Sequence, residues 1–120
     1  MARGHQITIT PTRLHVEVVV GGETVAKSDR PVLLHETGLP TRYYLPREDV
    51  RIELLRPTDR TTTCPFKGKA SYWSVAAGGE VYDNLAWSYE DPIPGAGAIA
   101  GLMCFYSERA QITVDGKVER

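Results

Sequence analysis

Two stretches of alternating apolar and polar residues, each ending in a Gly-Gly pair, constrain the fold most strongly. The first runs through valines at positions 16, 18 and 20 and ends in Gly21-Gly22. The second covers residues 70–77 and ends in Gly78-Gly79. Alternation with a period of two is typical of a strand that buries one face. A Gly-Gly pair readily adopts the positive φ angles of a tight hairpin turn. Both stretches therefore predict β-hairpins.

The rest of the chain also favours strand over helix. Short runs rich in β-branched and aromatic residues predict further strands at 6–10, 32–35, 41–45, 50–55, 85–89, 103–106 and 110–114. Helix is expected only as one turn at 46–49 and a short segment of small residues at 95–102. We predict a mainly β fold, a small antiparallel sandwich or barrel-like domain of two pseudo-repeated sub-sheets with one or two short helices.

The two Gly-Gly segments also begin a weak internal repeat. Residues 18–23 match residues 75–80, and residues 35–40 match residues 89–94. Further on, Tyr43-Tyr44 resembles Phe105-Tyr106. A true duplication would relate two sub-sheets by a pseudo-twofold axis and place Glu36 and Glu90 at equivalent positions. Chance similarity between short hairpins is the alternative.

Composition indicates one small globular domain. The chain has 120 residues, of which 42% are hydrophobic and 24% charged, with a net charge of −1. We expect a single β-rich domain over residues 1–120, with a partly flexible N-terminus at 1–10 and a tail at 117–120. The near-neutral charge predicts no nucleic-acid partner. No apolar run is long enough to span a bilayer, so we expect no membrane partner and a soluble, cytoplasmic protein.

Cysteine content and charge distribution give two further expectations. Cys64 and Cys104 are too few for a disulfide framework, and closely spaced Cys and His ligands for zinc are absent. We therefore expect no metal and no cofactor. Half of the 14 Lys and Arg lie between residues 42 and 69, whereas every charged residue from 70 to 108 is acidic. These segments either form two solvated faces or pair across a homodimer.

Four separated runs carry a family resemblance: residues 32–40 (VLLHETGLP), 42–46 (RYYLP), 63–68 (TCPFKG) and 86–92 (AWSYEDP). Together they resemble domain-of-unknown-function family 427, over roughly residues 15–116. The resemblance implies a compact β-rich domain. The family sometimes carries a nucleotidyltransferase-like label, but this chain lacks the clustered carboxylates and the phosphate-binding loop that nucleotidyl transfer requires.

The matched runs fall at strand ends beside proline or glycine turns, where scaffolds usually present functional side chains. We expect the fold to bring them to one pocket, with Glu36 facing Arg42 or Lys67. An aromatic wall would come from Trp73 or Trp87, unless both tryptophans belong to the core. The predicted ligand-binding residues are Glu36, Arg42, Tyr44, Cys64, Lys67, Trp73, Trp87 and Glu90.

Two sets of residues in this group are candidates for catalysis. Cys64 could act as a nucleophile, because Lys67 three residues later could stabilise a thiolate. His35, oriented by Glu36, would then be its base. The alternative is a small buried hydrophobic residue. Glu36 and Glu90 could act as general acid and base if they converge, or each could simply pair with an arginine.

The leading interpretation is a domain that binds an unknown small molecule in an aromatic and polar pocket, with or without modest catalytic activity. A planar heterocycle would suit tryptophan faces and the donors of Arg42 and Lys67. The first alternative is a hydrolase or transferase that uses Cys64 or the glutamate pair. The second is a homodimeric interaction module whose aromatic residues form the core.

Overall fold

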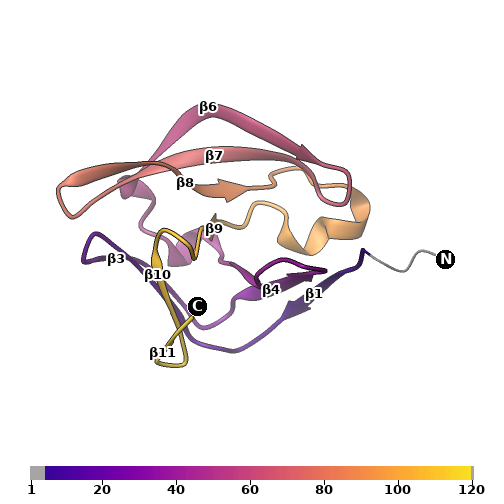
Figure 1. The fold of residues 1–120 in the computed structure, drawn as a ribbon, viewed down its shortest axis with the longest axis horizontal. Coiled ribbons are helices and arrows are strands. Elements are labelled where there is room, and N and C mark those ends of the chain that lie inside the picture. Colours follow the sequence, from indigo (N-terminus) through magenta and orange to yellow (C-terminus); the bar gives the residue numbers. More distant parts are fainter. Residues whose placement is uncertain (1–4, 120) are drawn as a thin grey trace.

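A computed structural model describes residues 5–119, which form antiparallel β-strands joined by turns and three short 3₁₀ helices (Figure 1). The elements are β1 (Ile7–Pro11), β2 (Val16–Val20), β3 (Glu23–Ser28), β4 (Val32–Glu36), β5 (Arg42–Tyr44), η1 (Arg47–Asp49), η2 (Ile52–Leu54), β6 (Leu55–Cys64), β7 (Gly68–Ala77), β8 (Glu80–Ser88), η3 (Pro94–Ile99), β9 (Cys104–Phe105), β10 (Gln111–Val114) and β11 (Lys117–Val118). No helix within 5–119 is long and apolar enough to cross a membrane.

The strands form three antiparallel sheets, with strand orders β1-β4-β5, β11-β10-β2-β3 and β6-β7-β8-β9. The predicted mainly β class is confirmed. The structure has three sheets where the sequence suggested two sub-sheets, and three short helices where it suggested one or two. The additional sheet arises because the chain breaks between β3 and β4. Pro31, which has no backbone N–H to donate, lies in this break, and the two strands belong to different sheets. Strand β8 has no such break and stays within one sheet.

Both Gly-Gly pairs lie at hairpin tips, as predicted. Gly21 and Gly22 have φ angles of 58° and 82°, and Gly78 and Gly79 have φ angles of 60° and 83°. The two tips lie at the same end of the molecule (Figure 1). They also touch, because a Cβ atom on Gly78 would lie only 2.1 Å from the carbonyl oxygen of Gly21.

Each Gly-Gly hairpin pairs with a strand from the other half of the chain. Val18 and Val75 occupy matching positions of the predicted repeat; Val18 pairs with Ile112 of β10, and Val75 pairs with Leu55 of β6. Long-range pairing of this kind holds the two halves of the chain together.

The buried side chains form two hydrophobic clusters. The first is mainly aliphatic and centres on β2, β3 and β10. The second is rich in aromatic side chains and consists of Leu34, Tyr44, Ala70, Tyr72, Trp87, Tyr89, Ala96, Ile99 and Cys104. The second cluster joins the β1-β4-β5 sheet to β7 and β8, and it supports the site described below.

The contact between the hairpin tips predicts unequal effects of two neighbouring substitutions. Gly78→Ala and Gly79→Ala both place a Cβ at positive φ, which costs about 1–2 kcal/mol. Gly78→Ala also drives its Cβ against Gly21, whereas a Cβ on Gly79 meets nothing within 4 Å. We expect Gly78→Ala to lower the free energy of unfolding by at least about 2 kcal/mol more than Gly79→Ala in urea denaturation. Equal losses would contradict the contact.

Candidate functional site

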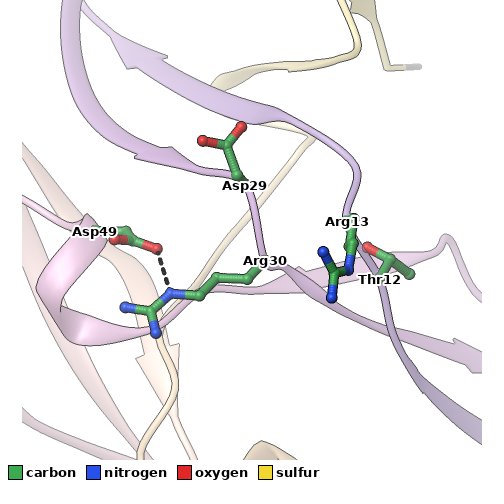
Figure 2. A pocket seen from close by; sticks show the side chains of 5 residues that line it. All are labelled: Thr12, Arg13, Asp29, Arg30 and Asp49. Atoms are coloured by element: carbon green, nitrogen blue, oxygen red, sulfur yellow. Dashed lines mark hydrogen bonds and ion pairs between the residues drawn. The ribbon is translucent and has the colours of Figure 1, made fainter.

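One hollow lies between the β1–β2 connection, the β3–β4 turn and η1. It measures about 550 Å³ and is lined by Thr12, Arg13, Asp29, Arg30 and Asp49 (Figure 2). Arg30 Nε binds Asp49 Oδ2 at 3.3 Å, and Asp29 points away from Arg30 (Figure 2) and contacts His15 Nδ1 at 2.6 Å. Among the described residues, no aromatic or large aliphatic side chain lines this hollow, so it offers a ligand little to pack against. It is the weaker candidate for a ligand site.

A second cavity has the mixed lining expected of a ligand site. It measures about 150 Å³ and is lined by Glu36, Leu39, Pro40, Arg42, Tyr44, Lys67, Tyr72, Trp87, Tyr89 and Tyr106. We call it the aromatic pocket. Its walls combine five aromatic rings with three ionisable groups, drawn from segments that are far apart in the sequence.

Strand geometry explains why these rings share one face. Side chains alternate across a strand, so Trp87 and Tyr89 point the same way. Tyr72 of β7 is paired directly with Trp87 of β8 and therefore lies beside it. On β5 the same alternation puts Arg42 and Tyr44 together on the pocket side.

A buried ion pair lies in the pocket wall. Lys67 Nζ donates to Glu36 Oε1 at 2.5 Å, and His5 Nε2 contacts the other carboxylate oxygen at 2.8 Å. The side chains of Glu36 and Lys67 are only 6% and 11% exposed. Burial alone would raise the pKa of Glu36, but Lys67 and His5 outweigh it and hold that pKa below its ordinary value. Glu36 therefore stays charged at neutral pH.

Arg42 forms the opposite wall and is held from two sides. Its guanidinium binds Glu108 through both terminal nitrogens, at 2.8 and 3.2 Å. It also lies over the rings of Trp87 and Tyr106, 5.2 and 5.5 Å from their centres. Trp87 Nε1–H in turn donates to the Tyr44 hydroxyl at 3.1 Å. Each of these side chains is therefore fixed by a neighbour.

Two neighbouring tyrosines line the pocket beside Trp87. The Tyr72 hydroxyl forms a hydrogen bond of 2.9 Å with Thr62. Burial would raise the pKa of Tyr72, but its neighbours Thr62, Tyr106 and Arg60 outweigh burial and lower it. Burial and the neighbouring Tyr72 raise the pKa of Tyr106 to about 12.

Five of the predicted ligand-binding residues lie together in this pocket: Glu36, Arg42, Tyr44, Lys67 and Trp87. Glu36 faces Lys67, one of its two predicted partners. Cys64 is half-buried and packs against the second hydrophobic cluster beneath the pocket.

The remaining predicted site residues lie elsewhere. Trp73 packs against the first cluster, with the Arg47 guanidinium 5.2 Å from its ring centre. Glu90 accepts a hydrogen bond of 2.5 Å from Arg47 and does not line the pocket. Glu36 and Glu90 therefore do not converge there. His35 contacts Thr41 at 3.0 Å and projects from the opposite face of β4, so Glu36 does not orient it.

Sequence reasoning missed His5 and three tyrosines of the site. Tyr89 lies on the same face as Trp87, which could be predicted because the two residues are two positions apart in the sequence. Choosing Tyr72 over its neighbour Trp73 needs the pairing of β7 with β8, which places Tyr72 opposite Trp87 and Trp73 opposite Ala86. Tyr106 follows the short strand β9, and His5 reaches Glu36 only because β1 pairs with β4.

The opposite charges of the two sequence segments pair within the chain at two points. Arg42 binds Glu108, and Arg47 binds Glu90. Two of the acidic residues that a charge-based dimer would use are therefore already bound to arginines of the same chain.

Comparison with protein families gives one match. The model of domain of unknown function 427 (DUF427) covers residues 8–116. The chain belongs to this family. A comparison with curated proteins found no match. The family carries a nucleotidyltransferase-like label, which implies a metal ion. Within 5–119, no three His, Cys, Asp or Glu side chains are placed to hold one, and we derive no step through a metal.

The Glu36–Lys67 pair predicts a pH-dependent contribution to stability. Glu36→Gln leaves Lys67 without its buried counter-charge and should cost about 3 kcal/mol of unfolding free energy at pH 7. Because the pKa of Glu36 is lowered in the folded protein, this contribution is present above about pH 4.5 and disappears as the pH falls through the folded pKa. Urea denaturation of both proteins between pH 3 and pH 7 measures it, the approximate range being set by carboxyl titration.

Glu90→Gln is the matched control, because Glu90 is paired with Arg47 at a site where its side chain is 54% exposed. We expect it to lose less than about 1 kcal/mol, as is usual for exposed pairs. If the two variants lose the same stability at every pH, the buried pair is wrongly assigned.

Burial also predicts which thiol reacts. Cys104 is fully buried, and burial raises the pKa of its thiol to about 12, so it should not react in the folded protein. Half-buried Cys64 should react with Ellman's reagent more slowly than free cysteine, and Cys64→Ser should remove all reaction until the protein is unfolded. A Cys64 that reacts faster than free cysteine would instead support the thiol-enzyme alternative.

Proposed function

We propose that the protein binds a small planar ring compound in the aromatic pocket. The observation that carries this proposal is the convergence of five aromatic rings with Glu36, Arg42 and Lys67 around one cavity. Apolar walls with a few fixed polar groups are the usual composition of small-molecule sites.

The size of the cavity limits the ligand. A volume of about 150 Å³ is comparable to an engineered cavity that admits benzene. One six-membered ring with a small substituent fits this space, and a fused polycyclic compound does not. Edge and face contacts with Trp87 and the tyrosines favour a planar ring over an aliphatic chain of the same size.

The buried ion pair supports a binding role over a purely structural one. Removing Glu36 and Lys67 from water carries a desolvation cost that an apolar pair of similar volume would avoid. Two charges held at the wall of a cavity offer a ligand both an acceptor and a donor. Because Lys67 and His5 already fix the carboxylate, its orientation does not have to be established when the ligand binds.

The alternative of an enzyme with a glutamate pair receives less support. General acid–base catalysis needs both groups within reach of one substrate, but Glu90 binds Arg47 away from the pocket that contains Glu36. Cys64 packs against the second hydrophobic cluster and is not in the lining of the pocket, so thiol chemistry in that pocket also receives less support.

The two tryptophans allow a direct test by fluorescence. In Trp73→Phe, Trp87 in the pocket wall is the only remaining tryptophan. Phenol and uracil are probes of the size of one ring. We expect each to change the emission of Trp87 until the signal saturates with increasing probe concentration, because either ring would contact or lie near the indole. Cyclohexanol, which is similar in size but not planar, should bind more weakly.

Trp87→Phe is the control for this test, since its remaining Trp73 packs against the other cluster. The same probes should leave its emission unchanged apart from a linear, non-saturating drift. Failure of every ring probe to saturate the Trp73→Phe signal at millimolar concentration would reject the proposed function.

A further inference from the structure

A second hollow adjoins the aromatic pocket. It measures about 300 Å³ and is lined by Arg60, Asp83, Asn84, Tyr106 and Arg109. We call it the arginine hollow. Tyr106 lines both spaces. The Arg60 guanidinium carbon also lies 4.9 Å from the ring centre of Tyr72, which lines the pocket. Tyr72 and Tyr106 therefore lie where the two spaces adjoin.

The two arginines of this hollow lack the carboxylate partner that four other described arginines have. Arg30, Arg42, Arg47 and Arg51 each have a carboxylate oxygen within 4.0 Å. Among residues 5–119, no carboxylate lies that close to Arg60 or Arg109. Arg109 Nη1 donates instead to the backbone oxygen of Asn84 at 3.4 Å. Two guanidinium groups thus face one hollow, with the exposed Asp83 as the only acid in its lining.

The backbone at the hollow is held in an unusual conformation. Asn84 has a φ angle of 51°, which is uncommon for a residue other than glycine. It coincides with the register shift of β8 against β7, and β6 has its own shift between Pro57 and Thr61. Thr58 Oγ1 joins the two irregular segments by donating to Asn84 Oδ1 at 2.6 Å. Bulges and strained residues of this kind concentrate beside functional sites.

These contacts leave donors directed at the hollow. The backbone N–H of Asn84 donates to Ser74, its backbone oxygen accepts from Arg109, and its side-chain oxygen accepts from Thr58. No described residue accepts from its side-chain NH₂ group. The lining therefore offers that amide and two guanidinium groups, which together match the oxygens of an anion.

We propose that the arginine hollow binds the anionic group, a carboxylate or a phosphate, of a ligand whose ring occupies the aromatic pocket. This inference rests on the proposed function and narrows the ligand class to ring compounds that carry a carboxylate or a phosphate group. Arg60 and Arg109 supply the charge, and Tyr106, which lines both spaces, lies where the ring and its anionic group would meet. Arg42 and Lys67 do not fill this role, because Glu108 and Glu36 already neutralise them.

Probe binding to the Trp73→Phe protein tests the inference. The probes are phenol, benzoate and phenyl phosphate, which share a ring and differ in charge. We expect at least one of the two anions to bind about tenfold or more tightly than phenol, since charge-assisted hydrogen bonds exceed neutral ones in strength. The anion that gains most identifies which acid the hollow prefers.

In the variant Arg60→Gln with Arg109→Gln the gain should disappear, so that the anions bind no more tightly than phenol binds to that same variant. Arg56→Gln is the matched control: Arg56 is exposed on the same strand β6, also lacks a carboxylate within 4.0 Å among residues 5–119, and is not in the lining of either space. It should keep the full gain. Urea denaturation of each variant verifies that it is folded.

The possible failures are distinguishable. If phenol binds but the anions bind no more tightly, or if their gain survives loss of both arginines, the anion site is wrong and the aromatic pocket stands. If no ring probe binds, the proposed function fails, and the anion site fails with it.

Discussion

A pair of backbone hydrogen bonds between Leu45 and Met103 holds the site together. Each residue donates its N–H to the carbonyl of the other at 2.8 Å, and both side chains are fully buried. The two bonds connect the end of β5 to the start of β9, which belong to different sheets. Arg42 on one side and Tyr106 on the other thereby come into contact. Without this junction the aromatic pocket would lose one wall, because no other strand pairing within residues 5–119 joins those sheets.

The polar groups of the pocket are arranged before any ligand arrives. Lys67 and His5 hold Glu36, and Glu108 holds Arg42. Such mutual restraint limits the side-chain entropy lost on binding, which usually reduces affinity. The neighbouring arginine hollow differs, because its two guanidinium groups lack acidic partners of this kind within the described chain. In the binding mode that we propose, the pocket provides shape and the hollow provides unbalanced charge.

Local patterns were enough to predict both hairpins and most strands. Period-two alternation and Gly-Gly pairs depend only on near neighbours, and β2 and β7 appear where the valines and small residues predict them. The strand predicted at 50–55 is wrong, because the 3₁₀ helix η2 (Ile52–Leu54) occupies most of it, and no pattern in the sequence indicated the long strand β6.

Five of the eight expected site residues line one pocket, since they lie at strand ends that the fold brings together. Trp73 and Glu90 could not be assigned this way. Trp73 lies opposite Ala86 and therefore on the other face from Trp87, and the partner of Glu90 is an arginine 43 positions earlier.

The pairing of β2 with the distant strand β10 has a consequence for the order of folding. Strand β2 needs β10 along one edge, and the backbone of His15 binds Asp115, 100 positions later in the chain. During synthesis the first hairpin therefore emerges with an unpaired edge that carries the valines of β2. Exposed apolar edges of this kind readily join other chains, and pairing between distant segments slows folding. The earliest structure formed therefore stays vulnerable to aggregation until β10 has been synthesised and covers this edge.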